Sequence, residues 1–392
     1  MRAVHGQGKP TRLVIDGKVL VEDHFSGIGH YAMSLLQALD AVLVDEPDLD
    51  VRLAVPFRRI GRLAPFGLRR IRPLPIYLPW AQFRRLVEEQ KLPPMDRFLG
   101  RGVYFFPNYV RWPLASAKSI TAIHDLSFEK VADSVDGPNA VYLRREVRNS
   151  IERSDLITAL TETMADEIAE HYEVARERIR VVGCAADMLR FYQRSVREVR
   201  EVTERLDIFG SYLLSVGNIE PRKNQIRLID AFCALPRDLA DGHTLVLVGA
   251  GAWKESEIRD RVQVAHEAGF KVKLLLGTVS DVDLPALYSG ATCSVYVSVY
   301  EGFGMPPLES MACQTPVITS NVSVMPEVAG GAAVLVDPTD TAVIAGALER
   351  VLTLGEAERA NLVALGLANV DRYDWADAAR ALLAAVRSLA EA

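Results

Sequence analysis

Few cysteines and no metal-binding pattern occur in this sequence. Its four cysteines lie far apart and include no C-x-x-C pair: Cys184, Cys233, Cys293 and Cys313. Disulfide frameworks and zinc sites both need cysteines at recurring spacings, so we expect free thiols in a reducing setting, with Cys293 and Cys313 buried in apolar stretches. The histidines show no metal spacing either. We therefore predict no metal and no cofactor.

Long hydrophobic segments are also missing. No apolar run approaches the ~20 residues that a membrane-spanning helix needs, and the first residues, MRAVHGQGKPTR, lack the apolar core of a signal peptide. Hydrophobic residues make up 49% and charged residues 24% of the sequence, which is typical of a globular protein. Its length of 392 residues suggests two domains. We expect a cytoplasmic protein.

Charge is low overall and uneven along the chain. The formal net charge of -6 argues against nucleic acid as a partner. Residues 56–91, however, carry eight Arg and one Lys against two Glu, a local net of +7, interleaved with aromatic residues: Phe57, Phe66, Tyr77, Trp80 and Phe83. Two interpretations stay open. Either this segment docks reversibly on the anionic inner face of a membrane, or its arginines pair with the acidic remainder of the chain.

Short apolar runs alternate with helix-period segments in the C-terminal half. We expect strands at 212–216, 244–248, 272–276, 293–297, 316–320 and 333–337. A helix over 224–235 would place Ile226, Ile229 and Phe232 on one face. Strands and helices in this alternation build βαβ units and a parallel sheet, and continuous apolar strands fit a sheet covered on both faces.

The N-terminal half repeats this pattern. Its expected strands are 12–16, 51–55, 103–107, 119–123, 155–160 and 178–182, with a helix near 28–39. The charged stretch 190–206 suits a linker. We therefore predict an α/β fold with two doubly wound Rossmann-like domains, 1–190 and 191–373, and a C-terminal helix, 374–392, that packs back on the first domain.

Ligands of open parallel sheets bind beyond the carboxyl ends of the strands. In the C-terminal half these positions hold Gly217, Gly249 and Thr278, and Arg222 and Lys223 follow the first strand. Glycines let a ligand approach the backbone, and an Arg fork beside a Lys suits a diphosphate. A solvated Arg–Lys pair on a turn is the alternative.

The segment Glu301–Glu309, EGFGMPPLE, carries the strongest signal. Gly302 and Gly304 permit a tight loop whose amides can face phosphate or sugar oxygens. The two prolines that follow suit the first turn of a helix, and Glu309 then lies one turn inside it. A capped helix with a surface glutamate explains neither the paired glycines nor the paired prolines.

Two other patterns are weaker. The run from Gly27 through Gly29 to Ala32 fits G-x-G-x-x-A, but it begins ten residues beyond the strand at 12–16, which argues against a nicotinamide enzyme. No G-x-x-x-x-G-K-[ST] run exists, which argues against a P-loop nucleotidase. On spacing alone, His124 and Asp125 fit a buried structural pair at a strand end as well as a catalytic one.

Several of these motifs together resemble family 4 glycosyltransferases. Glu301 and Glu309 form an E-x7-E pair, and SVYEGFGMPPLESMACQTPVITSNVSVMPEVAGGAAVLVDP is similar to the signature region of that family. SVGNIEPRKN resembles its G-x-x-x-P-R-K-N segment. SGIGHY, TAIHDLSF and RYDWADAARALL, with Trp375, resemble segments of its bacterial mannosyltransferase-like members.

The resemblance implies a fold and an activity. The fold would be GT-B, in which two doubly wound domains face each other across a cleft. The activity would be retaining, metal-independent transfer of a hexosyl group from a nucleotide sugar to a glycan or lipid-linked acceptor, in polysaccharide or glycolipid assembly. GDP-mannose is the first-choice donor. UDP- or dTDP-hexoses, a soluble acceptor, and a catalytically silent scaffold protein remain alternatives.

The resemblance also implies residue roles. Arg222 and Lys223 would hold the diphosphate, Glu309 the ribose, and Thr278 the base. Glu301 would face the transferred sugar, together with the amides of Gly302, Phe303, Gly304 and Met305. His124 would lie near the anomeric centre and acceptor, and Gly27 or Gly29 near the diphosphate. One departure is the GCAAD run at 183–187, where relatives carry a P-N-G-V-D-like segment.

Overall fold

The computed structural model describes residues 11–23, 27–131, 137–251 and 255–391. By its contacts the chain forms two compact units. Unit 1 extends to His124 and adds Val141–Cys184 and the segment from Asp374; unit 2 comprises Asp125–Ala140 and Ala185–Tyr373. The chain therefore passes between the units four times, at 124/125, 140/141, 184/185 and 373/374, and the third of these lies nearest to the boundary that the sequence places at 190.

Unit 1 is built on a seven-stranded sheet of order β3-β2-β1-β4-β5-β6-β7, in which every pair is parallel. The strands are β1 (Thr11–Asp16), β2 (Leu49–Pro56), β3 (Arg72–Ile76), β4 (Val103–Phe106), β5 (Lys118–Ala122), β6 (Leu156–Ala159) and β7 (Ile179–Val181). All six strands predicted here are present. Strand β3 was not predicted, because its RPLPI sequence contains two prolines, which only an edge strand tolerates.

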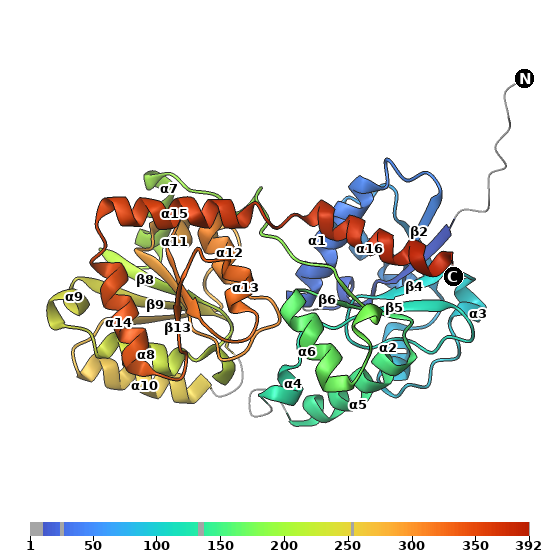
Figure 1. Ribbon diagram of the computed structural model, residues 1–392, viewed down its shortest axis with the longest axis horizontal. Coiled ribbons are helices and arrows are strands. Elements are labelled where there is room, and N and C mark those ends of the chain that lie inside the picture. Colours follow the sequence, from blue (N-terminus) through green and yellow to red (C-terminus); the bar gives the residue numbers. More distant parts are fainter. Residues whose placement is uncertain (1–10, 24–26, 132–136, 252–254, 392) are drawn as a thin grey trace, which may run out of the picture. The chain divides into compact units, whose positions relative to one another are not determined.

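Helices cover both faces of this sheet. Figure 1 shows α1 (Gly27–Val42) and α16 (Trp375–Ala390) along one face, and α2 (Trp80–Glu88) and α5 (Gly137–Arg153) along the other. The remaining helices of this part of the chain are η1 (Lys18–Leu20), η2 (Phe57–Phe66), α3 (Asp96–Leu99), α6 (Glu162–Tyr172) and η4 (Arg176–Arg178). Helix α16 belongs to unit 1, where Leu382, Leu383 and Val386 are buried and the helix packs against α1.

Unit 2 is built on a six-stranded parallel sheet of order β10-β9-β8-β11-β12-β13. Its strands are β8 (Ser211–Val216), β9 (His243–Gly249), β10 (Val272–Leu276), β11 (Cys293–Tyr296), β12 (Val317–Ser320) and β13 (Val334–Val336), each within one residue of its predicted bounds. Its helices are α4 (Ser127–Lys130), α7 (Val196–Arg205), η5 (Pro221–Lys223), α8 (Gln225–Cys233), α9 (Arg237–Asp241), α10 (Glu255–Glu267), α11 (Leu284–Gly290), α12 (Met305–Ala312), α13 (Met325–Ala329), α14 (Thr341–Leu352) and α15 (Glu356–Val370).

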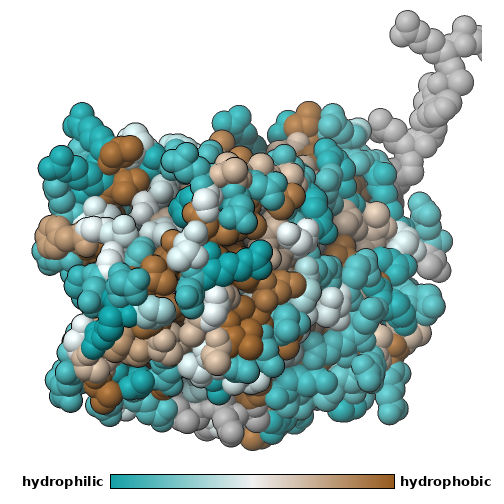
Figure 2. All heavy atoms as spheres, turned by 60° about the vertical axis from the view of Figure 1, so that its left-hand side comes forward, coloured by the Kyte–Doolittle hydropathy of each residue, from teal (hydrophilic) through white to brown (hydrophobic). Residues whose placement is uncertain are grey.

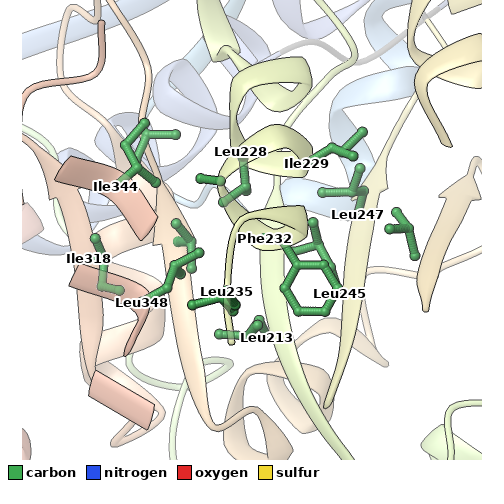
Figure 3. Close-up of a cluster of buried hydrophobic side chains, with 14 of the residues drawn as sticks. Leu213, Leu228, Ile229, Phe232, Leu235, Leu245, Leu247, Ile318, Ile344 and Leu348 are labelled. Carbon is green, nitrogen blue, oxygen red and sulfur yellow. The ribbon is translucent and has the colours of Figure 1, made fainter. Parts of the chain in front are cut away.

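Helix α8 presses one face onto the sheet of unit 2. Leu228, Ile229 and Phe232 point into a cluster with Leu213, Leu245, Leu247, Ile318, Ile344 and Leu348 (Figure 3). Each such side chain contributes ~1.5–3 kcal/mol when fully buried. The prediction that Ile226 shares this face is wrong, since Ile226 is 38% exposed. The 3.6-residue period puts Leu228 there instead.

The predicted linker at 190–206 is wrong for its second half, which forms helix α7. Ser195 and Glu198 make a capping box, and Arg197 pairs with Glu201 one turn further on. These local interactions stabilise a helix despite the high charge. Val202 is buried where α7 packs against α11.

Over the described residues, no helix is both long and apolar enough to cross a membrane. On the face shown in Figure 2, apolar side chains are interspersed among hydrophilic ones. The expected free thiols are confirmed, and Cys293 and Cys313 are buried.

Candidate active site

Glu301 is the centre of a charged network at the carboxyl edge of the unit 2 sheet. One carboxylate oxygen accepts a hydrogen bond from Arg222 Nη1 at 2.8 Å, and the other accepts from Lys223 Nζ at 2.7 Å and from the Tyr296 hydroxyl at 2.8 Å. Lys223 also donates to the Tyr296 hydroxyl. Arg222 has a second carboxylate partner, Glu220, at 3.0 Å. The predicted phosphate ligands and the predicted sugar ligand thus contact one another.

Burial and charge have opposing effects in this network. Burial alone would raise the pKa of Glu301, but attraction to Lys223 and Arg222 outweighs it and lowers that pKa to about 2. Burial also favours loss of charge on Arg222, yet Glu301 and Glu220 raise its pKa above the ordinary value. The pKa of Lys223 is lowered, mainly by burial. Glu301 is therefore an anion at any neutral pH, suited to accept hydrogen bonds and not to donate protons.

Local backbone features place Glu301 just before helix α12. Ser323 holds the loop, because its hydroxyl accepts from the Glu301 amide at 3.2 Å and donates to the Glu301 carbonyl at 2.7 Å. Gly304, the residue before α12, has φ +89°. A side chain at Gly304 would be strained by that φ and would press on Met325. The predicted prolines do occupy the first turn, and α12 begins at Met305.

The loop residues differ in exposure. Gly302 and Gly304 are buried, Met305 is half-buried, and Phe303 is 4% exposed and packs edge-on against Tyr373, with 5.6 Å between ring centroids. The Phe303 side chain is therefore part of the core, and only its backbone amide is a candidate ligand.

Glu309 lies one helical turn further on, in a different setting. Its carboxylate accepts a hydrogen bond from the Tyr288 hydroxyl at 3.0 Å and has no ion-pair partner among the described residues. Burial raises the pKa of Glu309 to about 7, only partly opposed by the Tyr288 hydrogen bond. This group titrates near neutral pH, unlike Glu301.

The glycines predicted at the strand ends lie where expected. Gly249 ends β9 and lies so close to the backbone of Gly217, which follows β8, that a side chain on Gly249 would overlap the Gly217 carbonyl. Thr278, after β10, is exposed. The two strand ends can approach this closely only because Gly249 lacks a side chain.

The remaining predicted residues belong to unit 1. His124, at the end of β5, is 7% exposed, and its Nε2 lies 2.7 Å from the Pro107 carbonyl oxygen. Its ring packs edge-on against Tyr31 and Tyr109, with ring centroids 4.9 and 5.4 Å away. Helix α1 starts at Gly27, where an added Cβ would meet nothing within 4 Å, and Gly29, two residues later, is buried.

Three contributors were not predicted from the sequence: Tyr296, Tyr288 and Glu220. Tyr296 ends β11, and a polar aromatic at a strand's carboxyl end is the signal that could have identified it. Glu220 stands two residues before Arg222, inside the quoted SVGNIEPRKN motif. Within the described residues, no group of three or more His, Cys, Asp or Glu side chains is placed to hold a metal ion.

The basic segment 56–91 divides into paired and unpaired arginines. Arg59 and Arg62 share Asp23 at 3.2 and 2.7 Å, and ion pairs on α2 join Arg84 to Glu88 and Arg85 to Glu89. Four exposed arginines make no ion pair with any described residue: Arg58, Arg69, Arg70 and Arg72. The rings of Phe57 and Tyr77, 55% and 78% exposed, stack at 5.4 Å.

Known protein families match both halves of the chain. The family described as glycosyltransferase family 4 matches residues 25–190, and that described as glycosyl transferases group 1 matches residues 207–364. Among curated relatives, O-antigen chain mannosyltransferase B of Escherichia coli is 29% identical, over 89% of this chain and 93% of the relative. An O-antigen chain mannosyltransferase of Salmonella typhimurium is 30% identical, over 62% of this chain but only 64% of the relative.

Solved structures share the architecture. An Anabaena protein, solved in complex with UDP and glucose, superimposes with a TM-score of 0.68 at 15% identity, covering 96% of this chain and all of the other. At that identity the likeness establishes the fold alone. Two parallel α/β sheets of seven and six strands are the GT-B-like architecture that the sequence predicts.

Proposed function

Since the chain belongs to the family 4 glycosyltransferases, we propose that it transfers a mannosyl group from GDP-mannose to a hydroxyl of a cell-surface glycan, with retention and without a metal. The two O-antigen mannosyltransferases among its relatives support this choice of sugar and acceptor. The observation that carries the proposal is the contact of Arg222 and Lys223 with Glu301 at the carboxyl edge of the unit 2 sheet.

Arg222 and Lys223 bind the diphosphate in this account. Breaking the bond between the sugar C1 and the phosphate oxygen leaves negative charge on the diphosphate, and two half-buried cations stabilise that charge more than water would. The amides of Gly302–Met305 add donors at the start of α12. The acceptor oxygen bonds to C1 on the same face, and its proton passes to the departing phosphate oxygen.

Glu301 changes partners when the donor binds. Its pKa of about 2 keeps it ionised, so it accepts hydrogen bonds from hydroxyls of the transferred sugar while the diphosphate takes over its cations. Glu309 binds the ribose, Thr278 the base, and the close backbones of Gly217 and Gly249 admit the nucleotide. In unit 1, His124 serves the acceptor side of the reaction, and Gly27 and Gly29 approach the diphosphate.

The donor is tested by a hydrolysis and transfer screen against GDP-mannose, UDP-hexoses and dTDP-hexoses. Release of GDP from GDP-mannose, at least tenfold faster than release from the others, is the expected result. Preference for a UDP-hexose would replace the mannosyl assignment, and the Anabaena structure with UDP and glucose makes this the second candidate. No turnover with any donor, with or without a divalent metal, would favour a silent scaffold protein.

A membrane surface is the proposed location of the acceptor. Two features of segment 56–91 in unit 1 support this location: the exposed rings of Phe57 and Tyr77 stack on each other, and four exposed arginines make no ion pair with a described residue, namely Arg58, Arg69, Arg70 and Arg72. Each such arginine contributes ~1 kcal/mol at an anionic surface, which gives reversible, salt-sensitive binding.

Co-sedimentation with anionic vesicles at low and high salt tests this location. Reversing the charge of those four arginines should abolish sedimentation, whereas reversing Arg84 and Arg85, already paired on α2, should leave most of it. A protein that ignores anionic vesicles at low salt would point to a soluble acceptor.

A further inference from the structure

A polar cavity of about 350 Å³ lies within unit 1, away from every residue assigned above. It is bounded by the end of α2, the segment that follows β4, and the second half of α5. The residues that matter here are Glu89, Arg111, Trp112, Arg145, Glu146 and Arg153. Its volume falls in the range of small-molecule sites.

The carboxylates of this cavity are already neutralised. Glu146 is 2% exposed and accepts from Arg145 Nε at 2.5 Å. Glu89, at the end of α2, accepts from Arg85 and Lys91 at 2.7 and 2.8 Å. The remaining two cations of the lining, Arg111 and Arg153, therefore lack a counter-charge inside the cavity.

Arg111 is the more unusual of the two. Among the described residues its guanidinium has no hydrogen-bond or ion-pair partner, and its Nε is buried. Burial, and then repulsion from Arg153, lower the pKa of Arg111. Two carboxylates act on Arg111 by their charge, Asp96 and Asp155, but both have other partners. Asp96 accepts hydrogen bonds from three backbone amides, and Asp155 pairs with Lys118 and accepts a hydrogen bond from the Ser119 amide.

Trp112 adds a second unsatisfied donor next to Arg111. The side chain is 1% exposed, and its indole N–H meets no acceptor in the described chain. Buried donors without acceptors are rare in native proteins and cost free energy, more so when charged. Two guanidiniums of like charge in one polar cavity would be stabilised by an anion between them.

We propose that this cavity binds a small oxyanion, a phosphate or carboxylate group, between Arg111 and Arg153. The half-buried Asn149, on the same stretch of α5, is placed to bind a hydroxyl next to that group. The site is distinct from the proposed diphosphate site, because none of its residues lies in unit 2. The inference therefore stands or falls independently of the proposed function.

Binding of inorganic phosphate at constant ionic strength tests the site. The protein should carry Arg222→Ala and Lys223→Ala, so that the cations of unit 2 do not contribute. We expect one phosphate per chain and a shift of the Trp112 indole N–H resonance, which Trp112→Phe identifies. Arg111→Gln should weaken phosphate binding about tenfold or more, as expected for a charge-assisted hydrogen bond.

Two further variants keep this test decisive. Arg153→Gln removes an exposed guanidinium at little risk to folding and should also weaken binding. The matched control is Arg84→Gln, which removes the same charge from an exposed ion pair on α2 outside the cavity. If Arg153→Gln and Arg111→Gln lose no more phosphate affinity than Arg84→Gln does, the proposal is wrong.

Comparing the affinities of several ligands distinguishes an anionic glycan from a free anion as the natural occupant. Mannose 6-phosphate or glucuronate binding tenfold tighter than inorganic phosphate would identify an anionic glycan, whereas equal affinities would identify a free anion. Methyl mannoside, which has no anionic group, should not bind. If it binds as tightly as the sugar phosphate, the oxyanion site is wrong.

Discussion

Glu301 and Glu309 stand eight residues apart, one before helix α12 and one inside it; Glu301 is buried and Glu309 is half-buried. Two cations and a tyrosine surround the first, and attraction to the cations outweighs burial and lowers its pKa to about 2. Among the described residues the second accepts a hydrogen bond from the Tyr288 hydroxyl alone, and burial raises its pKa to about 7. Burial acts in the same direction on both carboxylates, and their protonation behaviour differs because of the neighbouring charges.

The largest loss of nucleotide affinity should come from removing Arg222 or Lys223, the cations that surround Glu301 but not Glu309. Arg222→Ala or Lys223→Ala leaves a bound diphosphate underpaired, which costs ~2–5 kcal/mol, or roughly 30-fold to several thousand-fold in affinity. Calorimetry with GDP measures this directly. The same change at Arg227, which contacts the Asn224 side chain and the Pro338 carbonyl, is the control. Near wild-type affinity in both cation variants would remove the diphosphate assignment.

The next effect sharpens the comparison through pH. Because the folded-state pKa of Glu309 is raised from 4.5 to about 7, the folded protein holds a proton that the unfolded chain releases. Its contribution to stability is therefore complete below pH ~4.5 and lost as pH rises towards 7, by up to ~3 kcal/mol.

Glu309→Gln should remove that dependence. Relative to wild type, the variant should gain unfolding free energy between pH 5 and 8, as followed by urea denaturation. Glu301→Gln should show no such gain, since its carboxylate is already ionised across this range. A parallel pH profile for wild type and Glu309→Gln would mean that Glu309 is ionised in the folded state at low pH.

A smaller effect is expected from the Tyr296 hydroxyl, which contacts both Glu301 and Lys223. Tyr296→Phe removes one hydrogen bond to Glu301 while both cations remain, so unfolding free energy should fall by ~1 kcal/mol. Turnover should fall a few-fold with nucleotide affinity kept. Loss of nucleotide affinity comparable to that of Lys223→Ala would show that Tyr296, and not Glu301, positions the lysine.

The sequence predicted the strands and helices around Glu301 and Glu309 better than it predicted the side-chain contacts of these two residues. Continuous apolar runs identified every strand of unit 2, and the Gly-Pro pattern located the start of α12. Neither could place Glu301 against Arg222, because these residues are 79 apart in sequence and meet only through the order of strands β8 and β11. Helix α7 was missed for the opposite reason: its local capping box was present, but the charge content indicated a linker.

The central claim is that Glu301 serves the transferred sugar and Glu309 the nucleotide. GDP affinity and mannosyl turnover of Glu301→Gln and Glu309→Gln, measured side by side, test it most directly. Glu309→Gln should bind GDP about tenfold more weakly, whereas Glu301→Gln should bind GDP within about twofold of wild type and lose turnover. Equal loss of GDP affinity in the two variants would contradict the account.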